Sequence, residues 1–310
     1  MKFRVIFLKK KYIYFIAFTL ILFILIAVLL LSRHYSPTFT NISEDKMLKA
    51  DFDGDGKEDI LSVRKNNDKY SVDVKIKNKI FPITTYKNSS TLCNYSSYWP
   101  MRITLMDVSR DKLPEIFIQT SNKDNPLQYV FVWNYEKFDN VLSNSNNILG
   151  FIDCKNNKTP KVISGKFQDN TISLSNYMFL NYKFKNYNYE NNTTFMGADT
   201  ICTFIQFVQG LPGTENFKPK DIFSSNLSNR ELQSISKLSS ENNTYIFQDS
   251  IFKENKCNQD GDVSEVYWTL NFRGISNLDK KTIKNYTINL LLTPDENSKD
   301  NYHFKISSLF

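Results

Sequence analysis

The stretch Asp51-Phe-Asp-Gly-Asp-Gly-Lys-Glu-Asp59 decides which fold we expect of this chain of 310 residues. Its four aspartates stand close together, and carboxylates this crowded repel one another unless a cation neutralises them. Calcium takes several oxygen ligands from a short loop, including one backbone carbonyl. Two glycines allow the tight turns that bring the side chains together. The stretch therefore predicts a calcium site formed by the side chains of Asp51, Asp53, Asp55 and Asp59 and the carbonyl of Lys57.

The residues after this loop exclude an EF-hand. In an EF-hand the twelfth position holds a bidentate Glu, and here that position is Ser62. No amphipathic helix follows, because residues 60–64 come directly after the loop and are typical of a strand. We therefore expect a calcium loop between β-strands. The alternative is an acidic, solvated turn that holds no ion.

The D-x-D-G-D-G-x-x-D core followed by an apolar strand resembles the metal loop of FG-GAP/VCBS-type repeats, the calcium-bearing blades of integrin-like β-propellers. A second copy at residues 107–115 matches the first position for position. Its ligand positions hold Asp107, Ser109, Asp111 and Glu115, with Leu113 at the carbonyl position. Both glycines are lost there and a serine replaces one acid, so metal binding at this copy stays open. A third copy at residues 153–161 has lost nearly all its acidic charge, and we expect it to keep only the turn.

The spacing of the three copies predicts a repeat domain. Their first residues are 56 and 46 residues apart, about one blade each. The resemblance implies a mainly-β domain over residues 47–192. Three blades cannot close a propeller, so we expect an incomplete β-propeller or a β-meander. Within it, the continuous apolar run Tyr129–Trp133 predicts a strand covered on both faces.

Residues 198–310 predict a separate α+β domain with a curved antiparallel sheet. Apolar residues at helical spacing precede Gly210, namely Ile201, Phe204, Ile205 and Val208. A second helix is expected over residues 229–238. Alternating apolar residues then predict strands at 245–252, 266–272, 286–292 and 302–306. This order of elements resembles the cone-shaped fold of nuclear-transport-factor-2-like and cystatin-like domains.

The N-terminal segment predicts a membrane anchor. Residues 1–11 form a basic tail, and residues 12–32 contain no charge over a length sufficient for a single transmembrane helix. The positive-inside rule places the tail in the cytoplasm and the C-terminal bulk outside the cell. We expect the cell to be a Gram-positive bacterium. Residues 33–46 are expected to be a linker. The alternative is a long cleaved signal peptide, and both interpretations export the remainder of the chain.

Charge and cysteine content narrow the class of protein further. Six Lys and Arg residues and no acid lie before residue 34, so they carry +6 of the net charge of +7. The near-neutral remainder argues against a nucleic-acid-binding face. The four cysteines lie in the exported part, where the simplest pairing is Cys93–Cys154 and Cys202–Cys257. Buried free thiols are the alternative.

Two functions from different classes follow from these patterns. The first is a membrane-anchored, extracellular, calcium-stabilised binding or scaffold protein, whose partner is an extracellular protein or a cell-wall ligand. The second is an isomerase- or hydrolase-like enzyme with a pocket in the C-terminal domain. No serine elbow, phosphate loop or H-E-x-x-H motif is present, and His34 and His303 suggest no acid–base pair. We expect Asp260–Asp262 to be a hairpin turn and the tryptophans to pack in cores. The sequence therefore predicts no catalytic residue and favours the binding protein.

Overall fold

The computed structural model describes residues 9–12, 14, 18–23, 40–41, 47–85, 91–154, 160–187, 194–214, 219–225, 227–295 and 302–310. The chain forms two compact units, Met1–Thr38 and Phe39–Phe310. In the first unit, residues 10–12, 14 and 18–23 are helical.

The structure corrects the expectation of a transmembrane helix over residues 12–32. No helix of the described residues is both long and apolar enough to cross a membrane. A span needs about twenty consecutive residues, and the described helical stretches are short. Residues 13, 15–17 and 24–32 of the expected span lie outside the described part of the chain.

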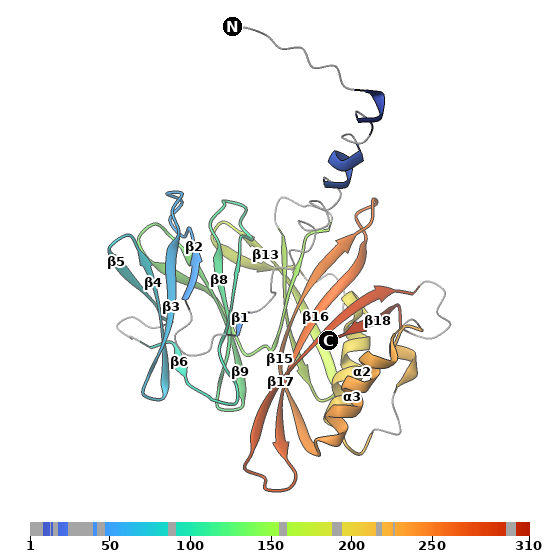
Figure 1. Ribbon diagram of the computed structural model, residues 1–310. Coiled ribbons are helices and arrows are strands. Elements are labelled where there is room, and N and C mark those ends of the chain that lie inside the picture. Colours follow the sequence, from blue (N-terminus) through green and yellow to red (C-terminus); the bar gives the residue numbers. More distant parts are fainter. Residues whose placement is uncertain are drawn as a thin grey trace. The chain divides into compact units, whose positions relative to one another are not determined.

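Three antiparallel four-stranded meanders follow one another in the second unit (Figure 1). The first contains β2 (Met47–Ala50), β3 (Asp59–Asn66), β4 (Lys69–Ile76) and β5 (Lys79–Ile83). The second contains β7 (Arg102–Met106), β8 (Glu115–Asn122), β9 (Asn125–Trp133) and β10 (Phe138–Asn144). The third contains β11 (Ile148–Ile152), β12 (Lys161–Gln168), β13 (Thr171–Leu180) and β14 (Lys183–Asn186). Two short strands extend these sheets: β1 (Thr40–Asn41) pairs with β7, and β6 (Cys93–Asn94) pairs with β4.

In each meander, one of the three similar loops joins the first strand to the second. The loop at 51–59 ends where Ala50 pairs with Asp59. In the same register, Met106 pairs with Glu115 in the second meander. Ile152 likewise pairs with Lys161 in the third. The three loops therefore occupy equivalent places in three equivalent hairpins.

The third meander continues into the C-terminal strands, which corrects the expected fold class of a β-repeat domain followed by a separate α+β domain. One eight-stranded sheet contains β11–β14 together with β15 (Asn243–Cys257), β16 (Val263–Ser276), β17 (Ile283–Pro294) and β18 (Phe304–Leu309). β15 pairs with β11 in parallel, and the other neighbours are antiparallel. The strands of the described residues form no closed propeller. The physical reason is the open edge of β11, whose backbone groups need a partner that β15 provides.

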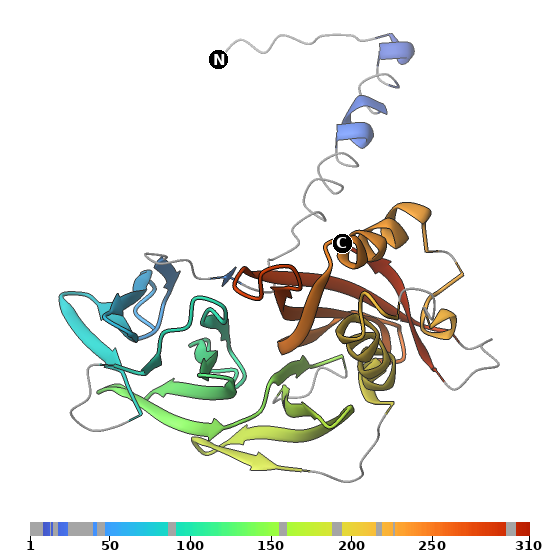
Figure 2. The same ribbon diagram turned by 90° about the horizontal axis from the view of Figure 1, so that it is seen from below.

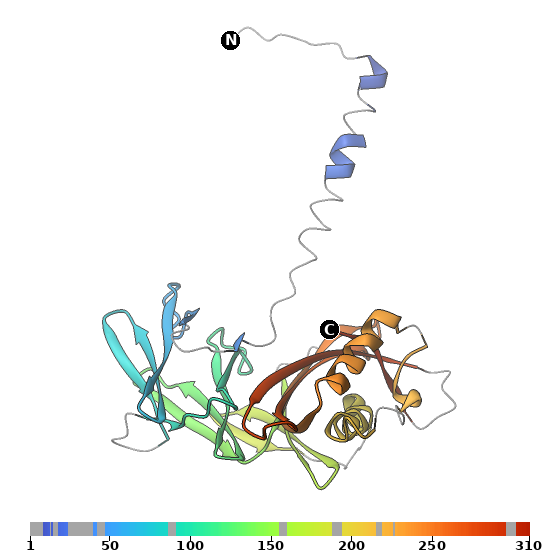
Figure 3. The same ribbon diagram turned by 60° about the horizontal axis from the view of Figure 1, so that its bottom comes forward.

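Two helices cover the C-terminal half of this sheet. They are α2 (Ala198–Gln209) and α3 (Asn229–Ser240), and short 3₁₀ turns occur at η1 (Phe195–Gly197) and η3 (Lys220–Ile222). Figure 3 shows α2 and α3 gathered beside β15–β18. The four α2 residues predicted to face the core, Ile201, Phe204, Ile205 and Val208, are fully buried. They share a core with Trp268 and Phe252, whose rings stack with centroids 4.3 Å apart.

The second meander lies between the first meander and the eight-stranded sheet (Figure 2). Its side chains belong to two further hydrophobic cores. On β9, Phe131 and Trp133 belong to the core shared with the first meander. Val130 and Val132 belong to the core shared with the eight-stranded sheet. Because successive strand residues point to opposite faces, both faces of this strand are covered. The strand predicted at Tyr129–Trp133 is confirmed.

A buried ion pair joins the second meander to the eight-stranded sheet. Arg102 of β7 donates to Asp249 Oδ2 of β15 at 2.6 Å, and both side chains are only 2 % exposed. Trp99 Nε1 donates to the same oxygen at 2.6 Å. Asn271 Nδ2 donates to Asp249 Oδ1 at 2.9 Å. With these three donors the buried carboxylate is paired, which a charge away from water requires.

Candidate metal centre

The first loop (residues 51–59) is folded by its own aspartates. Asp51 Oδ1 accepts the N–H of Gly54 at 2.7 Å, and Asp51 Oδ2 accepts the N–H of Gly56 at 2.8 Å. The two glycines have φ of 79° and 83°, which glycine adopts without strain. As a result, carboxylate oxygens of Asp51, Asp53 and Asp55 lie within 4.8 Å of one another.

This separation fits a calcium ion. Calcium binds oxygen at 2.3–2.6 Å, so two ligand oxygens on one ion lie at most about 5.2 Å apart. Asp53 Oδ1 accepts the N–H of Asp55 at 3.2 Å, and Asp55 Oδ1 accepts the N–H of Lys57 at 2.9 Å. These bonds use one oxygen of each aspartate and orient the carboxylates. Three of the four predicted carboxylates are thus brought together, and the backbone N–H of Lys57 is bonded to one of them, Asp55.

Asp59, the fourth predicted carboxylate, closes the base of the loop. Its Oδ2 accepts the N–H of Phe52 at 3.0 Å, and the residue is 5 % exposed. Burial raises the pKa of Asp59; the Phe52 N–H opposes the rise, and the charges of the other loop aspartates add to it. Asp59 lies outside the group of three mutually close carboxylates among the described residues.

Lys77, which the sequence did not single out, reaches into the first loop from the turn between β4 and β5. Its Nζ lies 2.6 Å from Asp53 Oδ2 and 3.2 Å from Asp55 Oδ2. These bonds raise the pKa of Lys77. The pKa of Asp55 is lowered, first by the Lys57 N–H and then by Lys77. Lys77 and Asp53 are 24 residues apart, and no local pattern could have paired them.

The second loop (residues 107–115) repeats the hydrogen bonds of the first. Asp107 Oδ1 accepts the N–H of the fourth loop residue at 2.6 Å, and its Oδ2 accepts that of the sixth at 3.0 Å. The fourth and sixth residues are Arg110 and Lys112, whose φ of 60° and 75° match those of the two glycines. Glu115 Oε2 accepts the N–H of Val108 at 2.7 Å, as Asp59 does from Phe52.

A second carboxylate group lies in this loop. Oxygens of Asp107, Asp111 and Glu115 are within 4.8 Å of one another. Glu115 is 2 % exposed, and burial raises its pKa to about 7 although the Val108 N–H and Ser109 oppose the rise. The two loops are neighbours, because a Cβ at Gly54 would lie 3.2 Å from Leu113 Cδ2.

The third loop (residues 153–161) is described only in part, since residues 155–159 lie outside the described chain. Its ninth position is Lys161, so the acid that closes the base of the other loops is missing. Glu254 of β15 takes this place and accepts the N–H groups of Asp153 and Cys154. Burial raises the pKa of Glu254, and these two N–H groups oppose the rise. Arg110 of the second loop pairs with Asp153.

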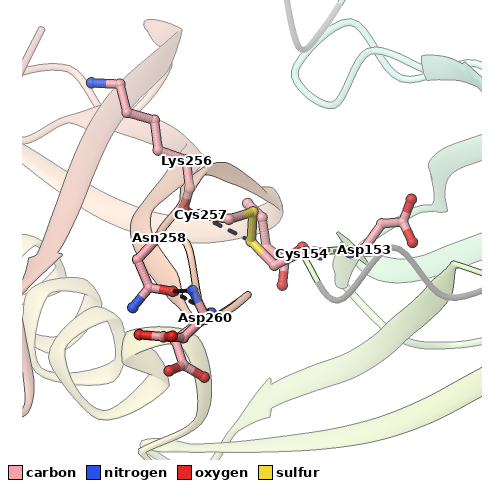
Figure 4. Close-up of a disulfide and its surroundings, with 8 residues drawn as sticks. Asp153, Cys154, Lys256, Cys257, Asn258 and Asp260 are labelled. Atoms are coloured by element: carbon pink, nitrogen blue, oxygen red, sulfur yellow. Dashed lines mark hydrogen bonds between the residues drawn. A yellow bond between two sulfur atoms is a disulfide. The ribbon is translucent and has the colours of Figure 1, made fainter.

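A disulfide also holds the third loop and corrects the expected cysteine pairing. Cys154 is bonded to Cys257 at the end of β15, with 5.6 Å between their Cα atoms (Figure 4). Figure 4 shows Asp153 pointing away from this bond. Cys93 and Cys202 are free, and burial raises the pKa of the Cys93 thiol to about 11. The expected pairing was wrong because β15 lies beside β11 of the third meander, and spacing along the chain does not reveal this contact.

The 258–262 turn, His303 and the tryptophans, which the sequence also drew attention to, show no arrangement that suggests a functional site. Asn258 Oδ1 accepts the N–H groups of Asp260 and Asp262 at 3.0 and 2.7 Å, which confirms the hairpin turn. His303 is exposed. The tryptophans pack as expected: Trp133 lies edge-on to Phe81 at 4.8 Å between centroids, and Trp268 stacks in the α2 core.

A half-open pocket of about 670 Å³ lies beside the third loop. Its lining includes the carboxylates of Asp153, Glu254 and Asp262 together with Lys161. Two of these acids are already engaged, Asp153 with Arg110 and Glu254 with two backbone N–H groups. Two of the pocket's acids are therefore held in structural contacts, and much of its remaining lining is apolar, including Met178, Phe195 and Met196.

Comparison with known proteins does not identify the function of this site. No family model matches the chain, and no curated protein matches it. The resemblance to FG-GAP/VCBS-type repeats stays a prediction that depends on the loops themselves.

Proposed function

We propose that this chain is a non-enzymatic binding or scaffold protein stabilised by calcium at the first loop. The observation that carries the proposal is the group of three carboxylates within 4.8 Å, in a frame of hydrogen bonds that recurs in the second loop. In this proposal Asp51, Asp53, Asp55 and the Lys57 carbonyl hold the ion, while Asp59 closes the base. The bound ion removes the repulsion between the carboxylates and fixes the β2–β3 hairpin.

The proposed place of action is outside the cell. The Cys154–Cys257 disulfide supports it, because disulfides persist in oxidising compartments and are rare in the cytosol. Extracellular sites can be loaded even when their affinity is only millimolar. We propose an extracellular protein or a cell-wall ligand as the partner. Engagement of Asp153 and Glu254 in structural contacts supports binding over catalysis at the neighbouring pocket.

Thermal unfolding of the full chain tests the calcium claim. In millimolar calcium, we expect the melting temperature to exceed that in EDTA by several degrees, because a ligand that binds only the folded state stabilises it. Asp53→Asn with Asp55→Asn should abolish this increase. Asp260→Asn with Asp262→Asn is the matched control, because it removes two alternating acids from another turn. Equal melting temperatures of the wild type in calcium and in EDTA would contradict the proposal.

A further inference from the structure

Lys77 provides a positive charge at the first loop. Its Nζ contacts Asp53 Oδ2 at 2.6 Å and Asp55 Oδ2 at 3.2 Å. The other oxygen of each aspartate accepts a backbone N–H. The ammonium group therefore uses the two oxygens that the loop's own hydrogen bonds leave for a cation.

The fold holds Lys77 at this place. Ile76 pairs with Lys79 across the turn that joins β4 to β5, so Lys77 is the first of only two turn residues. Its φ of 55° lies in the left-handed region. Ile76 is 4 % exposed and belongs to the core between the first two meanders. The backbone of Lys77 is thus fixed, while its side chain, 63 % exposed, can move away.

We propose that Lys77 is a built-in counter-ion that holds the ion-free first loop together and is displaced when calcium binds. This inference concerns the regulation of the proposed calcium site and rests on that function. An ammonium group 2.6 Å from Asp53 Oδ2 would lie at most about 5.2 Å from a calcium ion bound to that oxygen at 2.3–2.6 Å, and two cations this close repel each other. The lysine and the ion therefore compete, and the lysine lowers the affinity of the loop for calcium.

The exposure of Lys77 limits the size of this effect. Exposed ion pairs contribute little, because water and salt screen them. We therefore expect removal of the charge to lower the dissociation constant for calcium by about three- to tenfold.

Isothermal titration of the full chain with calcium chloride at fixed ionic strength tests the competition. Lys77→Gln should bind about three- to tenfold more tightly than the wild type, and Lys77→Arg, which keeps the charge, should stay close to it. Lys79→Gln is the matched control: it removes the same charge two residues away in the same hairpin, and should change the constant less than about twofold. Equal constants for Lys77→Gln and Lys79→Gln would overturn the inference.

Melting temperatures provide a readout that does not need calcium. In EDTA, Lys77→Gln should melt below Lys79→Gln, because the ion-free loop has lost its counter-ion. In saturating calcium the two should melt together. Equal melting in EDTA would overturn the inference and leave the calcium site standing. If Lys77→Gln binds calcium and the wild type does not, the proposed function fails while the competition is supported.

Discussion

Glu115 is a carboxylic acid almost wholly buried at the base of the second loop, with a pKa raised to about 7. Its ordinary value is 4.5, so the folded protein holds this proton more strongly than the unfolded chain does. Protonated Glu115 therefore contributes its full stabilisation to the folded protein below about pH 4.5, and this contribution is lost as the pH rises through 7. The loss is on the order of 3 kcal/mol, from 1.36 kcal/mol for each pKa unit.

Urea unfolding in EDTA at pH 4.5 and pH 8 measures this loss. Relative to Glu115→Gln, which is neutral throughout, the wild type should lose free energy of unfolding as the pH rises. Comparison with the variant removes the contributions of other titrating groups. Parallel pH profiles for the two proteins would contradict the raised value, because they require the pKa of Glu115 to be the same in the folded and unfolded states.

Arg110 shows how a single position can change its role between repeats. Its backbone adopts the left-handed conformation that Gly54 adopts in the first loop, at φ of 60° and 79°. The side chain that glycine lacks reaches the third loop and pairs with Asp153. Arg110 therefore combines a left-handed backbone, which is less favourable than it is for glycine, with a side-chain contact between neighbouring loops that glycine cannot make.

Among the elements, the third loop differs from the other two because a covalent bond and an acid from β15 hold it. Cys154 and Cys257 are 103 residues apart in the chain. A disulfide that closes so long a loop contributes about 2–5 kcal/mol, chiefly by restricting the unfolded chain. The variant Cys154→Ser with Cys257→Ser should lose stability in that range.

Urea unfolding in calcium and in EDTA tests whether this disulfide acts independently of the first loop. The loss should be equal in both conditions, because distant sites contribute additively. Cys202→Ser is the control, since its free thiol contacts the Asn170 carbonyl and a hydroxyl can replace it. A loss that disappears in calcium would contradict independent action.

For the whole molecule, the buried pair of Arg102 and Asp249 joins sheets that come from distant parts of the sequence. Arg102→Met leaves the carboxylate buried without its cation and should lower the free energy of unfolding by about 3–5 kcal/mol. Adding Asp249→Asn should recover part of the loss, because no buried charge remains. Arg64→Met removes the exposed pair with Asp73 and should cost less than about 1 kcal/mol. Equal losses for Arg102→Met and Arg64→Met in urea would contradict this account.

Local features of the fold were predictable from the sequence. The loop at 51–59 carries its own turn residues and its clustered carboxylates, and helix α2 carries its apolar stripe, so short-range patterns were sufficient. The partner of β11 was not predictable, because a strand pattern shows which faces are buried and not which strand lies beside it. The roles of Lys77 and Glu254 were not predictable for the same reason, because both side chains reach their loops from strands or turns far away in the chain.

The parallel pairing of β11 with β15 also determines when the eight-stranded sheet can form during synthesis of the chain. The first two meanders consist of sequential hairpins, and such contacts of low sequence separation form quickly. β11 must wait until residues 243–257 have left the ribosome, because its outer edge has no neighbour before then. Nascent chains that stop short of β15 present that unpaired edge to other chains, so we expect them to associate with one another through it.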